Sequence, residues 1–313
     1  MTGIIVLVYK SYEQVLRYVH QELCKVGCEH RVVIVDVGSP VASAERVAAA
    51  LGTAVTAIDA AAVDRRGGLF VIHSPDNLGY ARGNNLGALF LLRHFPETDK
   101  LLFSNDDIEF ITPDVVEQLG AKLDEMPAVG CIGPRVIDLN EHDQGPEYEA
   151  TTVGRSILIN ALIPFVGAAF FTPPASAERP RENGEAYIVG GCFHMLRTAD
   201  FLAAGMFDAR TFLYFEEEIL SERLRRIGKA VYYYPAVRIR HFVGNTTGKH
   251  RSNVALVKTH LAGQWLYYRD YRRASWPALA ALKLSAWLRL LLVYLADRKN
   301  ALKRRAGQRR PAE

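Results

Sequence analysis

Cysteine is scarce in this sequence, with four residues in 313: Cys24, Cys28, Cys131 and Cys192. The one close pair, Cys24 and Cys28, falls in a helical pattern and does not repeat elsewhere as a paired metal-binding spacing. This usage argues against a disulfide-stapled secreted domain and against a zinc ribbon. We therefore expect reduced thiols and a cytoplasmic protein.

An export signal and a long uncharged apolar run are also missing. Residues 4–8 follow Met1-Thr2-Gly3 directly, without the basic segment that opens a signal peptide, and read as a first strand. Near the other end, Lys283 and Arg289 interrupt the apolar stretch 276–296. Because no 18-residue uncharged span remains, a transmembrane helix is not expected.

Two common phosphate-binding motifs are absent. The segment 77–87 holds three glycines, but their spacing is not G-x-G-x-x-G, and no Gly-Lys-Ser/Thr follows as in a P-loop. No internal repeat and no DNA- or RNA-binding signature is present, so we expect no nucleic-acid partner.

Charge is distributed unevenly along the chain. Residues 245–313 carry fifteen Lys and Arg against Asp270, Asp297 and Glu313, a net charge of +12. The total is +4, so residues 1–244 carry −8. An acidic body with a basic tail predicts an anionic partner, and we favour a membrane surface.

Strand and helix patterns alternate through the first half. Strands are predicted at residues 4–8, 31–35, 69–73 and 101–104, and helices at 12–26, 42–51 and 81–95. With 49% hydrophobic residues the chain can bury a large core. The alternation predicts an α/β fold with a mainly parallel sheet flanked by helices.

The sequence centres on an apolar run, residues 101–104, that ends in Asn105, Asp106 and Asp107. Ligands of open α/β sheets bind at the carboxyl ends of the strands, where carboxylates can hold a divalent cation against phosphates. Helix capping is the alternative interpretation, since residues 111–114 resemble a helix start. Asp36 ends an earlier strand in the same way and is a candidate for contacting a ribose or base.

The segment 77–87 enters a helix after the third strand. Its glycines allow a ligand to approach the backbone closely, and Arg82 and the asparagines supply hydrogen-bond donors for a phosphate or sugar. A glycine-rich helix entry capped by asparagine is an equally good interpretation.

The second half has a different character. Residues 138–186 predict long surface loops, and 186–196 a strand with a Gly-Gly close approach. An aromatic cluster is followed by three consecutive acids, Glu216, Glu217 and Glu218. They either form part of a functional site or are favoured by the dipole of a helix that begins there. A final strand is predicted at 231–234. His241 ends the alternating apolar and basic run that follows, and it is either a structural residue or a metal ligand.

Taken together, these blocks resemble family 2 glycosyltransferases of the GT-A fold, in the branch of bacterial rhamnosyltransferases and galactofuranosyltransferases. The matching blocks span roughly residues 3–248: Tyr9, Asp36 to Ser39, Asn77 to Gly87, Asn105 to Asp107, and Gly190-Gly191 through Phe207-Asp208, Glu216-Glu217, Arg223, Gly228, Pro235 and His241. Their order and spacing, rather than any one block, carry the resemblance.

The resemblance implies roles for individual residues. Asp107 stands at the principal metal ligand of the D-x-D motif, with His241 completing a Mg²⁺ or Mn²⁺ site, and the catalytic pair falls on Glu216 and Glu217. The donor sugar nucleotide is expected to contact Tyr9, Asp36, Asn77, Gly79, Arg82, Asn85, Asn105, Asp106 and Gly191. The reaction implied is transfer of a sugar from dTDP-rhamnose or a UDP-sugar to a glycan or lipid-linked acceptor, with inversion.

Four positions depart from the family pattern. Asn105 replaces an Asp, Glu217 stands where Asp is usual, Ile219 replaces a second acid, and Lys10 replaces an Asn. An active enzyme is still expected, with Glu217 as general base. A catalytically weak donor-binding partner subunit and a nucleotide-sugar hydrolase are the alternatives.

The tail completes the prediction. We expect a glycosyltransferase domain at 1–248 and a basic, apolar helical extension at 249–313. Leu284, Leu288, Leu291, Leu292 and Leu295 fall in one sector of a helix, and basic residues follow directly. This pattern predicts a peripheral protein on the inner face of the cell membrane, and a contact between copies in a homo-oligomer is the alternative.

Overall fold

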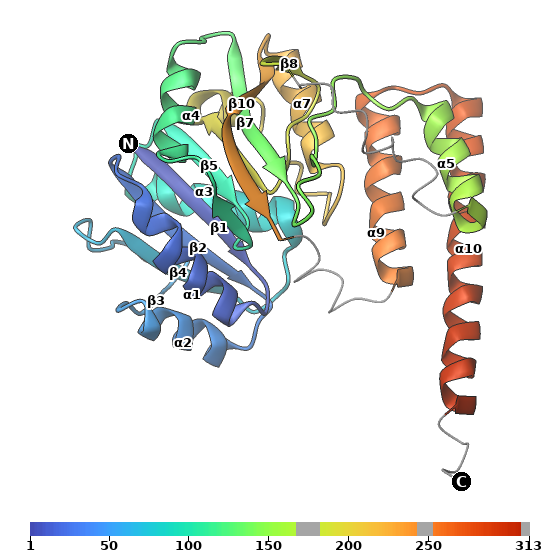
Figure 1. The fold of residues 1–313 in the computed structure, drawn as a ribbon, viewed down its shortest axis with the longest axis horizontal. Helices are drawn as coiled ribbons and strands as arrows, with labels where there is room; N and C mark the ends of the chain where they lie inside the picture. Colours follow the sequence, from blue (N-terminus) through green and yellow to red (C-terminus); the bar gives the residue numbers. More distant parts are fainter. Residues whose placement is uncertain (167–181, 243–252, 308–313) are drawn as a thin grey trace. The chain divides into compact units, whose positions relative to one another are not determined.

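The computed structural model describes residues 1–166, 182–242 and 253–307. It divides into two compact units: residues 1–150 with 180–249, and residues 151–179 with 250–313. The first contains the sheet and the second is helical (Figure 1).

Unit 1 is built on a ten-stranded sheet of order β3-β4-β2-β1-β5-β9-β7-β10-β6, with β8 paired to β10. The parallel part consists of β1 (Thr2–Val8), β2 (His30–Val37), β3 (Val55–Thr56), β4 (Leu69–Ser74) and β5 (Lys100–Ser104). The rest is mixed: β6 (Ile108–Phe110), β7 (Val129–Ile137), β8 (Gly184–Ala186), β9 (Phe193–Arg197) and β10 (Ala230–His241). The predicted α/β class with its mainly parallel sheet is confirmed. The antiparallel pairs lie in the part of the sheet beyond β5, which is formed by the strands that come later in the sequence.

Helices cover both faces of this sheet. Alternate residues of β1 face opposite sides, so Ile4 and Val6 join one core while Ile5 joins the other. The first core is closed by α1 (Tyr12–Gln21), α2 (Val41–Ala50) and α4 (Val115–Asp124). The second is closed by α3 (Gly79–His94), α6 (Thr198–Ala203) and α7 (Glu216–Arg226). Strands buried on both sides explain the near-continuous apolar runs.

Unit 2 consists of α5 (Val153–Val166), α9 (Asn253–Leu266) with the π-helical turn Tyr267–Tyr271, and α10 (Trp276–Gly307). A buried polar network joins the helices: Asn160 Nδ2 donates to Gln264 Oε1 at 2.7 Å, and Arg289 Nη1 donates to Asn160 Oδ1 at 3.0 Å. These hydrogen bonds link one polar side chain from each of the three helices inside an otherwise apolar bundle.

Several predicted boundaries change. The helix expected over 12–26 ends at Gln21 and continues as a 3₁₀ turn, Leu23–Lys25. The strand expected over 186–196 is two strands, β8 and β9, because the Gly190-Gly191 segment leaves the ladder. The loops expected over 138–186 contain the 14-residue helix α5. The final strand extends from Ala230 to His241, and a register shift between Tyr234 and Arg238 accommodates Pro235.

The prediction about a membrane-crossing helix also needs correction. Residues 276–299 of α10 are long and apolar enough to cross a membrane by length and composition. We required a span without any charge, but a helix that contains two charged residues, here Lys283 and Arg289, can still be apolar enough on average. The Lys283 ammonium lies 5.7 Å from the centroid of the Trp265 ring, and Arg289 bonds to Asn160. One helix of this kind is weak evidence for a span.

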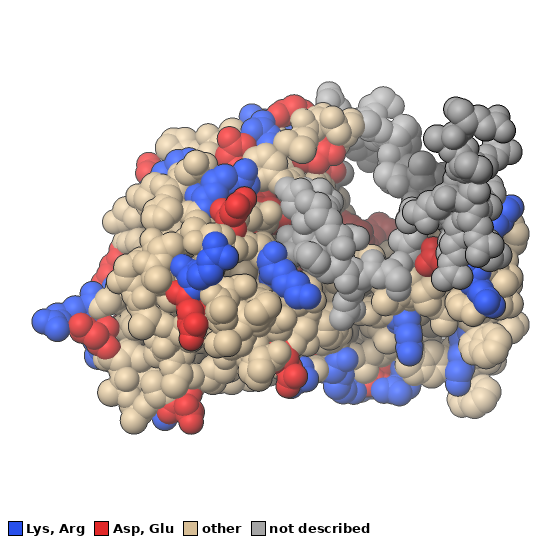
Figure 2. Space-filling view, turned by 90° about the horizontal axis from the view of Figure 1, so that it is seen from below, with Lys and Arg blue, Asp and Glu red and all other residues tan. Residues whose placement is uncertain are grey.

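Charged side chains of both signs are interspersed over the face of unit 1 seen in Figure 2. The acidic surplus of the body is therefore not gathered into one patch on that face.

Candidate functional site

The predicted site residues from β2 and β5 lie at one edge of the sheet. Asp36 is paired in register with Val8 of β1, and Ser104, which precedes Asn105, is paired with Val6. The strands are parallel, so their carboxyl ends meet at this edge. The expected grouping of these acids is observed.

Asp106 is held by the start of α1. Its Oδ1 accepts a 2.7 Å hydrogen bond from Gln14 Nε2, and its Oδ2 accepts a short one from the Ser11 hydroxyl. Burial, assisted by the neighbouring Asp107 charge, raises the pKa of Asp106 to about 7. Both oxygens are occupied by protein groups, so Asp106 anchors the tip of β5. Ser11 and Gln14 were not among the predicted residues.

Asp107 and His241 meet across β6 and β10. The antiparallel pairing sets His241 opposite Ile108, and this places His241 Nε2 3.2 Å from Asp107 Oδ1. The other ring nitrogen, Nδ1, lies 2.9 Å from Gln144 Oε1. Since an amide oxygen only accepts, Nδ1 carries a proton, and Nε2 is the atom directed at the carboxylate. Two residues predicted as a pair, 134 positions apart, are therefore brought together.

The Asp107 carboxylate suits a hard divalent cation, and the His241 imidazole could add a nitrogen ligand for a transition metal. Mg²⁺ is usually bound by one or two carboxylates together with substrate phosphates, and metal-ligating histidines commonly hold their second nitrogen in a hydrogen bond, as Gln144 does here. Asp107 Oδ1 is buried and makes no hydrogen bond of normal geometry in the described residues. Within residues 1–166, 182–242 and 253–307 no three Asp, Glu, His or Cys side chains converge as a complete ligand set, so phosphate oxygens would have to complete it.

Asp36 is nearly buried, with a 3% exposed fraction, and its Oδ2 lies 3.7 Å from His73 Nδ1. Burial raises the pKa of Asp36, while hydrogen bonds from Ser39 and the His73 charge oppose the shift. Asp36 Oδ1 makes no hydrogen bond in the described part of the chain and can accept one from a ligand.

The entry to α3 serves mainly to shape the backbone. Asn77 Oδ1 accepts a hydrogen bond from the Gly79 amide at 3.0 Å, which forms an Asx turn ahead of the helix, and Gly79 has φ +71° with the Phe212 backbone against it. Asn85 uses its whole amide on Phe207, donating to the carbonyl at 2.9 Å and accepting the amide at 3.1 Å. Arg82 is exposed. Of these predicted donor contacts, Arg82 is the side chain most available to a ligand.

The glycines further along α3 have a different purpose from the one expected. A side chain at Gly83 would meet Leu7 of β1, and one at Gly87 would meet Ile5 and Val35. They allow the helix to pack closely on the sheet and do not approach a ligand.

Glu217 lies against the backbone of Gly191. A Cβ atom on Gly191 would overlap Glu217 Oε1 and lie 2.6 Å from Cδ, closer than real Cβ atoms come to other atoms. The Gly191 carbonyl accepts a 2.6 Å hydrogen bond from the Tyr80 hydroxyl of α3. Glycine at position 191 leaves room for the carboxylate where it lies, and Tyr80, absent from the prediction, fixes that stretch of backbone.

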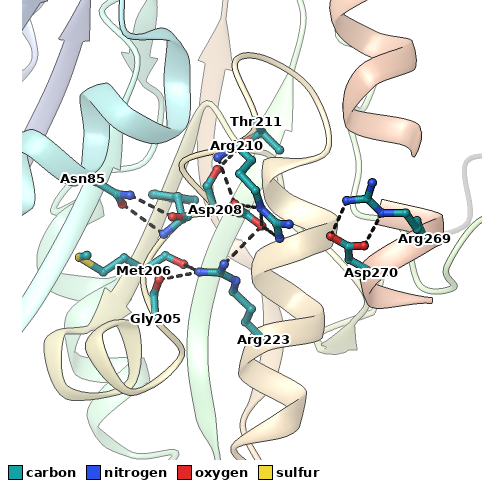
Figure 3. Close-up of polar contacts among 10 residues, drawn as sticks. Asn85, Gly205, Met206, Asp208, Arg210, Thr211, Arg223, Arg269 and Asp270 are labelled. Carbon is teal, nitrogen blue, oxygen red and sulfur yellow. Dashed lines mark hydrogen bonds and ion pairs between the residues drawn. The ribbon is translucent and has the colours of Figure 1, made fainter. Parts of the chain in front are cut away.

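The turn that delivers the acids is braced by ion pairs (Figure 3). Asp208 is only 4% exposed. Its Oδ2 forms ion pairs with Arg210 Nη2 at 2.6 Å and with Arg223 Nη2 of α7 at 3.3 Å. Arg223 also donates to the carbonyls of Gly205 and Met206, at 2.5 and 2.9 Å. These contacts tie α7 to the 205–211 turn.

Backbone strain precedes the acids. Tyr214 and Phe215 have φ of 77° and 71°, a left-handed conformation that bulky residues rarely adopt and that costs on the order of 1–3 kcal/mol each. Such strain is usual where a functional side chain has to be aimed.

The three glutamates are unusual as a group. Burial raises the pKa of each: well above the ordinary value for Glu216, to about 8 for Glu218, and upward for Glu217. The Glu217 charge adds to the shift at both neighbours. A helix dipole would lower these values, so the acids are more than a favourable first turn.

Cys192 connects the two groups of acids. Its carbonyl accepts the Asn105 amide at 2.8 Å, next to Asp106 and Asp107. The preceding residue, Gly191, is in contact with the Glu217 carboxylate. A metal-type pair and a candidate base are therefore joined through one short backbone segment, an arrangement suited to transfer from an anionic donor.

Known proteins similar to this chain include an N-acetylglucosaminyl-diphospho-decaprenol L-rhamnosyltransferase of Mycobacterium tuberculosis, from strains H37Rv and CDC 1551. The identity is 25% over 226 residues, which cover 70% of this chain and 72% of the relative. No family model matches the chain.

Solved structures resemble it at low identity. GalNAc-T7 with UDP, GalNAc and Mn²⁺ aligns with a TM-score of 0.57 and 12% identity over 87% of this chain and 49% of that one, so this chain spans about half of its length. The mannosyltransferase PcManGT of Pyrobaculum calidifontis, with GDP-Man and Mn²⁺, aligns with a TM-score of 0.52 and 12% identity over 96% and 75%. The predicted GT-A fold is confirmed, and so is the resemblance to the rhamnosyltransferase-like branch.

Proposed function

We propose that this protein is an inverting glycosyltransferase that moves a sugar, rhamnose or a sugar carried by UDP, from a nucleotide diphosphate to a hydroxyl of a lipid-linked or glycan acceptor in bacterial surface polysaccharide synthesis. The observation that carries the proposal is the placement of Asp107 with His241, and of Glu217 on Gly191, around the same short segment. The sequence similarity to a rhamnosyltransferase with a polyprenol-linked substrate supports it.

The chemistry explains why both groups are needed. Cleavage of the sugar–phosphate bond leaves positive charge at the anomeric carbon and negative charge on the departing diphosphate. Asp107 and His241 would hold Mg²⁺ or Mn²⁺, which neutralises diphosphate oxygens as a Lewis acid. Asp36, at the end of β2, would accept a hydrogen bond from the nucleoside.

Glu217 supplies the remaining step. Its carboxylate accepts the proton of the acceptor hydroxyl as the oxygen bonds to the anomeric carbon, opposite the leaving diphosphate. One displacement inverts the anomeric centre. A raised pKa makes Glu217 a stronger base once it is ionised.

The test is an acceptor-dependent assay on the full chain. Nucleotide release is measured for dTDP-rhamnose and a panel of UDP-sugars, with and without a polyprenyl-diphosphate-linked N-acetylglucosamine, and NMR of the product gives the anomeric configuration. Release that needs acceptor supports the proposal. Equal release without acceptor indicates a hydrolase, and donor binding without release indicates a partner subunit.

We also propose that unit 2 attaches the enzyme to an anionic membrane. Large apolar side chains of α10 are exposed in one stripe: Trp276, Leu284, Trp287, Leu288, Leu291, Tyr294 and Leu295, with exposed fractions from 40% to 82%. The buried Leu282 and Ser285 lie on the opposite side. Exposed Arg298 and Lys299 follow, and an apolar stripe with basic residues supplies the two signals that stable attachment needs.

Liposome co-sedimentation tests the attachment. Replacing Trp287 and Leu291 with serine is expected to weaken binding to anionic vesicles about tenfold or more, because two large apolar groups no longer leave water. The matched control replaces Leu89 and Leu202 of unit 1 with serine; these side chains are 49% and 46% exposed. This variant is expected to co-sediment with the vesicles as the wild type does. An unchanged sedimentation with loss of a dimer would assign the stripe to a contact between copies.

A further inference from the structure

A small cavity lies beside the Glu217 carboxylate, on the inner side of α7. Glu217 and Ser221 line it from α7, one helical turn apart, and His194 of β9 and Cys131 of β7 line it from the sheet. Aliphatic side chains such as Val189 complete the wall. None of these neighbours belongs to the predicted site except Glu217.

Two polar side chains in this wall are buried. His194 is 2% exposed and Ser221 is 1% exposed. Neither ring nitrogen of His194 nor the Ser221 hydroxyl makes a hydrogen bond of normal geometry within the described residues. Buried polar groups are nearly always satisfied, by protein or by an ordered water, and a polar cavity next to them is where such a water binds.

Acidic groups adjoin Glu217 in the described part of the chain. Glu216 and Glu218 lie beside it on α7, Glu147 lies in the segment that follows β7, and the Tyr80 hydroxyl lies nearby on α3. Burial, together with the Glu147 charge, disfavours the ionised form of Glu217. Among the residues that line the cavity, His194 and Ser221 offer the strong donors, since a thiol such as Cys131 donates weakly.

His194 has the right protonation state for this purpose. Burial lowers the pKa of His194 to about 4, against a smaller opposing effect of the Gly190 backbone, so the ring is neutral at pH 7. A neutral imidazole carries one N–H donor and one acceptor nitrogen. It can therefore orient a water without adding charge to the site.

We propose that His194 and Ser221 hold one water molecule against the inner side of the Glu217 carboxylate and so fix its orientation for accepting the acceptor's proton. The inference rests on the proposed transferase function. His194 and Ser221 are positioning residues, because they act on the acceptor only through Glu217. The water donates to the carboxylate and accepts from Ser221 or His194, and no bond is made or broken at it.

Kinetics of His194→Phe and Ser221→Ala test the positioning role. Loss of a donor makes the ionised carboxylate harder to form, so the acid-side pKa of kcat is expected to rise by about one unit, with donor KM unchanged. His194→Gln, which keeps a donor, is expected to restore most of the wild-type profile. Cys131→Ala, which alters the same cavity without removing a strong donor, is the matched control. An unmoved profile in folded His194→Phe and Ser221→Ala would overturn the proposal, and so would a His194→Gln profile shifted as far as that of His194→Phe.

A high-resolution crystal structure of the full chain tests the water independently of activity. Density for a water within hydrogen-bonding distance of Glu217 and of His194 or Ser221 supports the inference, and a dry cavity overturns it. A wild-type protein that holds this water but transfers no sugar would refute the proposed function on its own.

Discussion

Replacing Gly191 with alanine should disable the protein while leaving it folded. The position does not require a left-handed backbone, so alanine brings no strain of its own, and the cost falls on Glu217. The added Cβ would overlap Glu217 Oε1 and lie 2.6 Å from Cδ, whereas ordinary contacts begin at 3.4 Å. The carboxylate must therefore withdraw by more than the 0.8 Å that separates these two distances. A misplacement on the order of 1 Å can cost about 10²-fold in rate, and we expect a fall in kcat of that size.

The assay compares kcat and donor KM of Gly191→Ala with those of Gly190→Ala. A Cβ at Gly190 would lie 3.2 Å from Val136 Cγ2, a contact that a small adjustment relieves, so this neighbour is a closely matched control. We expect Gly190→Ala to retain most activity, and both variants to bind the donor nucleotide with near wild-type affinity. Wild-type kcat in Gly191→Ala would refute the assignment of Glu217 as the base. Equal loss in both variants would show that the segment, rather than the carboxylate, was disturbed.

Three further outcomes are expected. Asp107→Ala should abolish transfer and metal-dependent donor binding in isothermal titration calorimetry, whereas Glu109→Ala, two residues further on, should keep both; full activity of Asp107→Ala in EDTA would contradict the metal site. Glu217→Gln should bind donor but lose about 10²-fold or more in kcat, as expected for loss of a general base. A dead Glu216→Gln beside an active Glu217→Gln would move the base by one residue. Burial, with the Glu217 charge, raises the pKa of Glu218 to about 8, so its neutral form stabilises the fold at low pH and that contribution is lost as pH rises through 8. Glu218→Gln should therefore reduce the fall in Tm between pH 5 and pH 9, and an identical fall in Tm for both proteins would count against the raised pKa.

The strands and helices of the first half of the chain could be predicted from the sequence because the patterns that indicate them are local. Each buried parallel strand is a short apolar run, and each intervening helix has an amphipathic period. The strand β7 was missed because Gly130, Gly133 and Pro134 interrupt it, and such residues ordinarily argue against a central strand. The helix α5 was missed because it is apolar on nearly every side and lacks a clear period.

Long-range organisation was less accessible. The helix α5 groups with the C-terminal helices about 100 positions away, and no local pattern encodes such a pairing. In the site, Asp107 with His241 came from the family resemblance, and the register of β6 with β10 supplied its geometry. Tyr80, Ser11 and Gln14 act through contacts across 92 to 111 positions, which a single sequence does not reveal.

The hydrogen bond from Tyr80 to Gly191 has a consequence for the order in which substrates add. Tyr80 lies in the first turn of α3, between the Asx turn at Asn77 and the exposed Arg82, where the donor is expected to bind. Gly191 is the surface on which the Glu217 carboxylate rests. A donor that orders this turn also immobilises the base before any acceptor arrives, so steady-state kinetics should follow a sequential mechanism with donor first, and Tyr80→Phe should weaken that obligatory order.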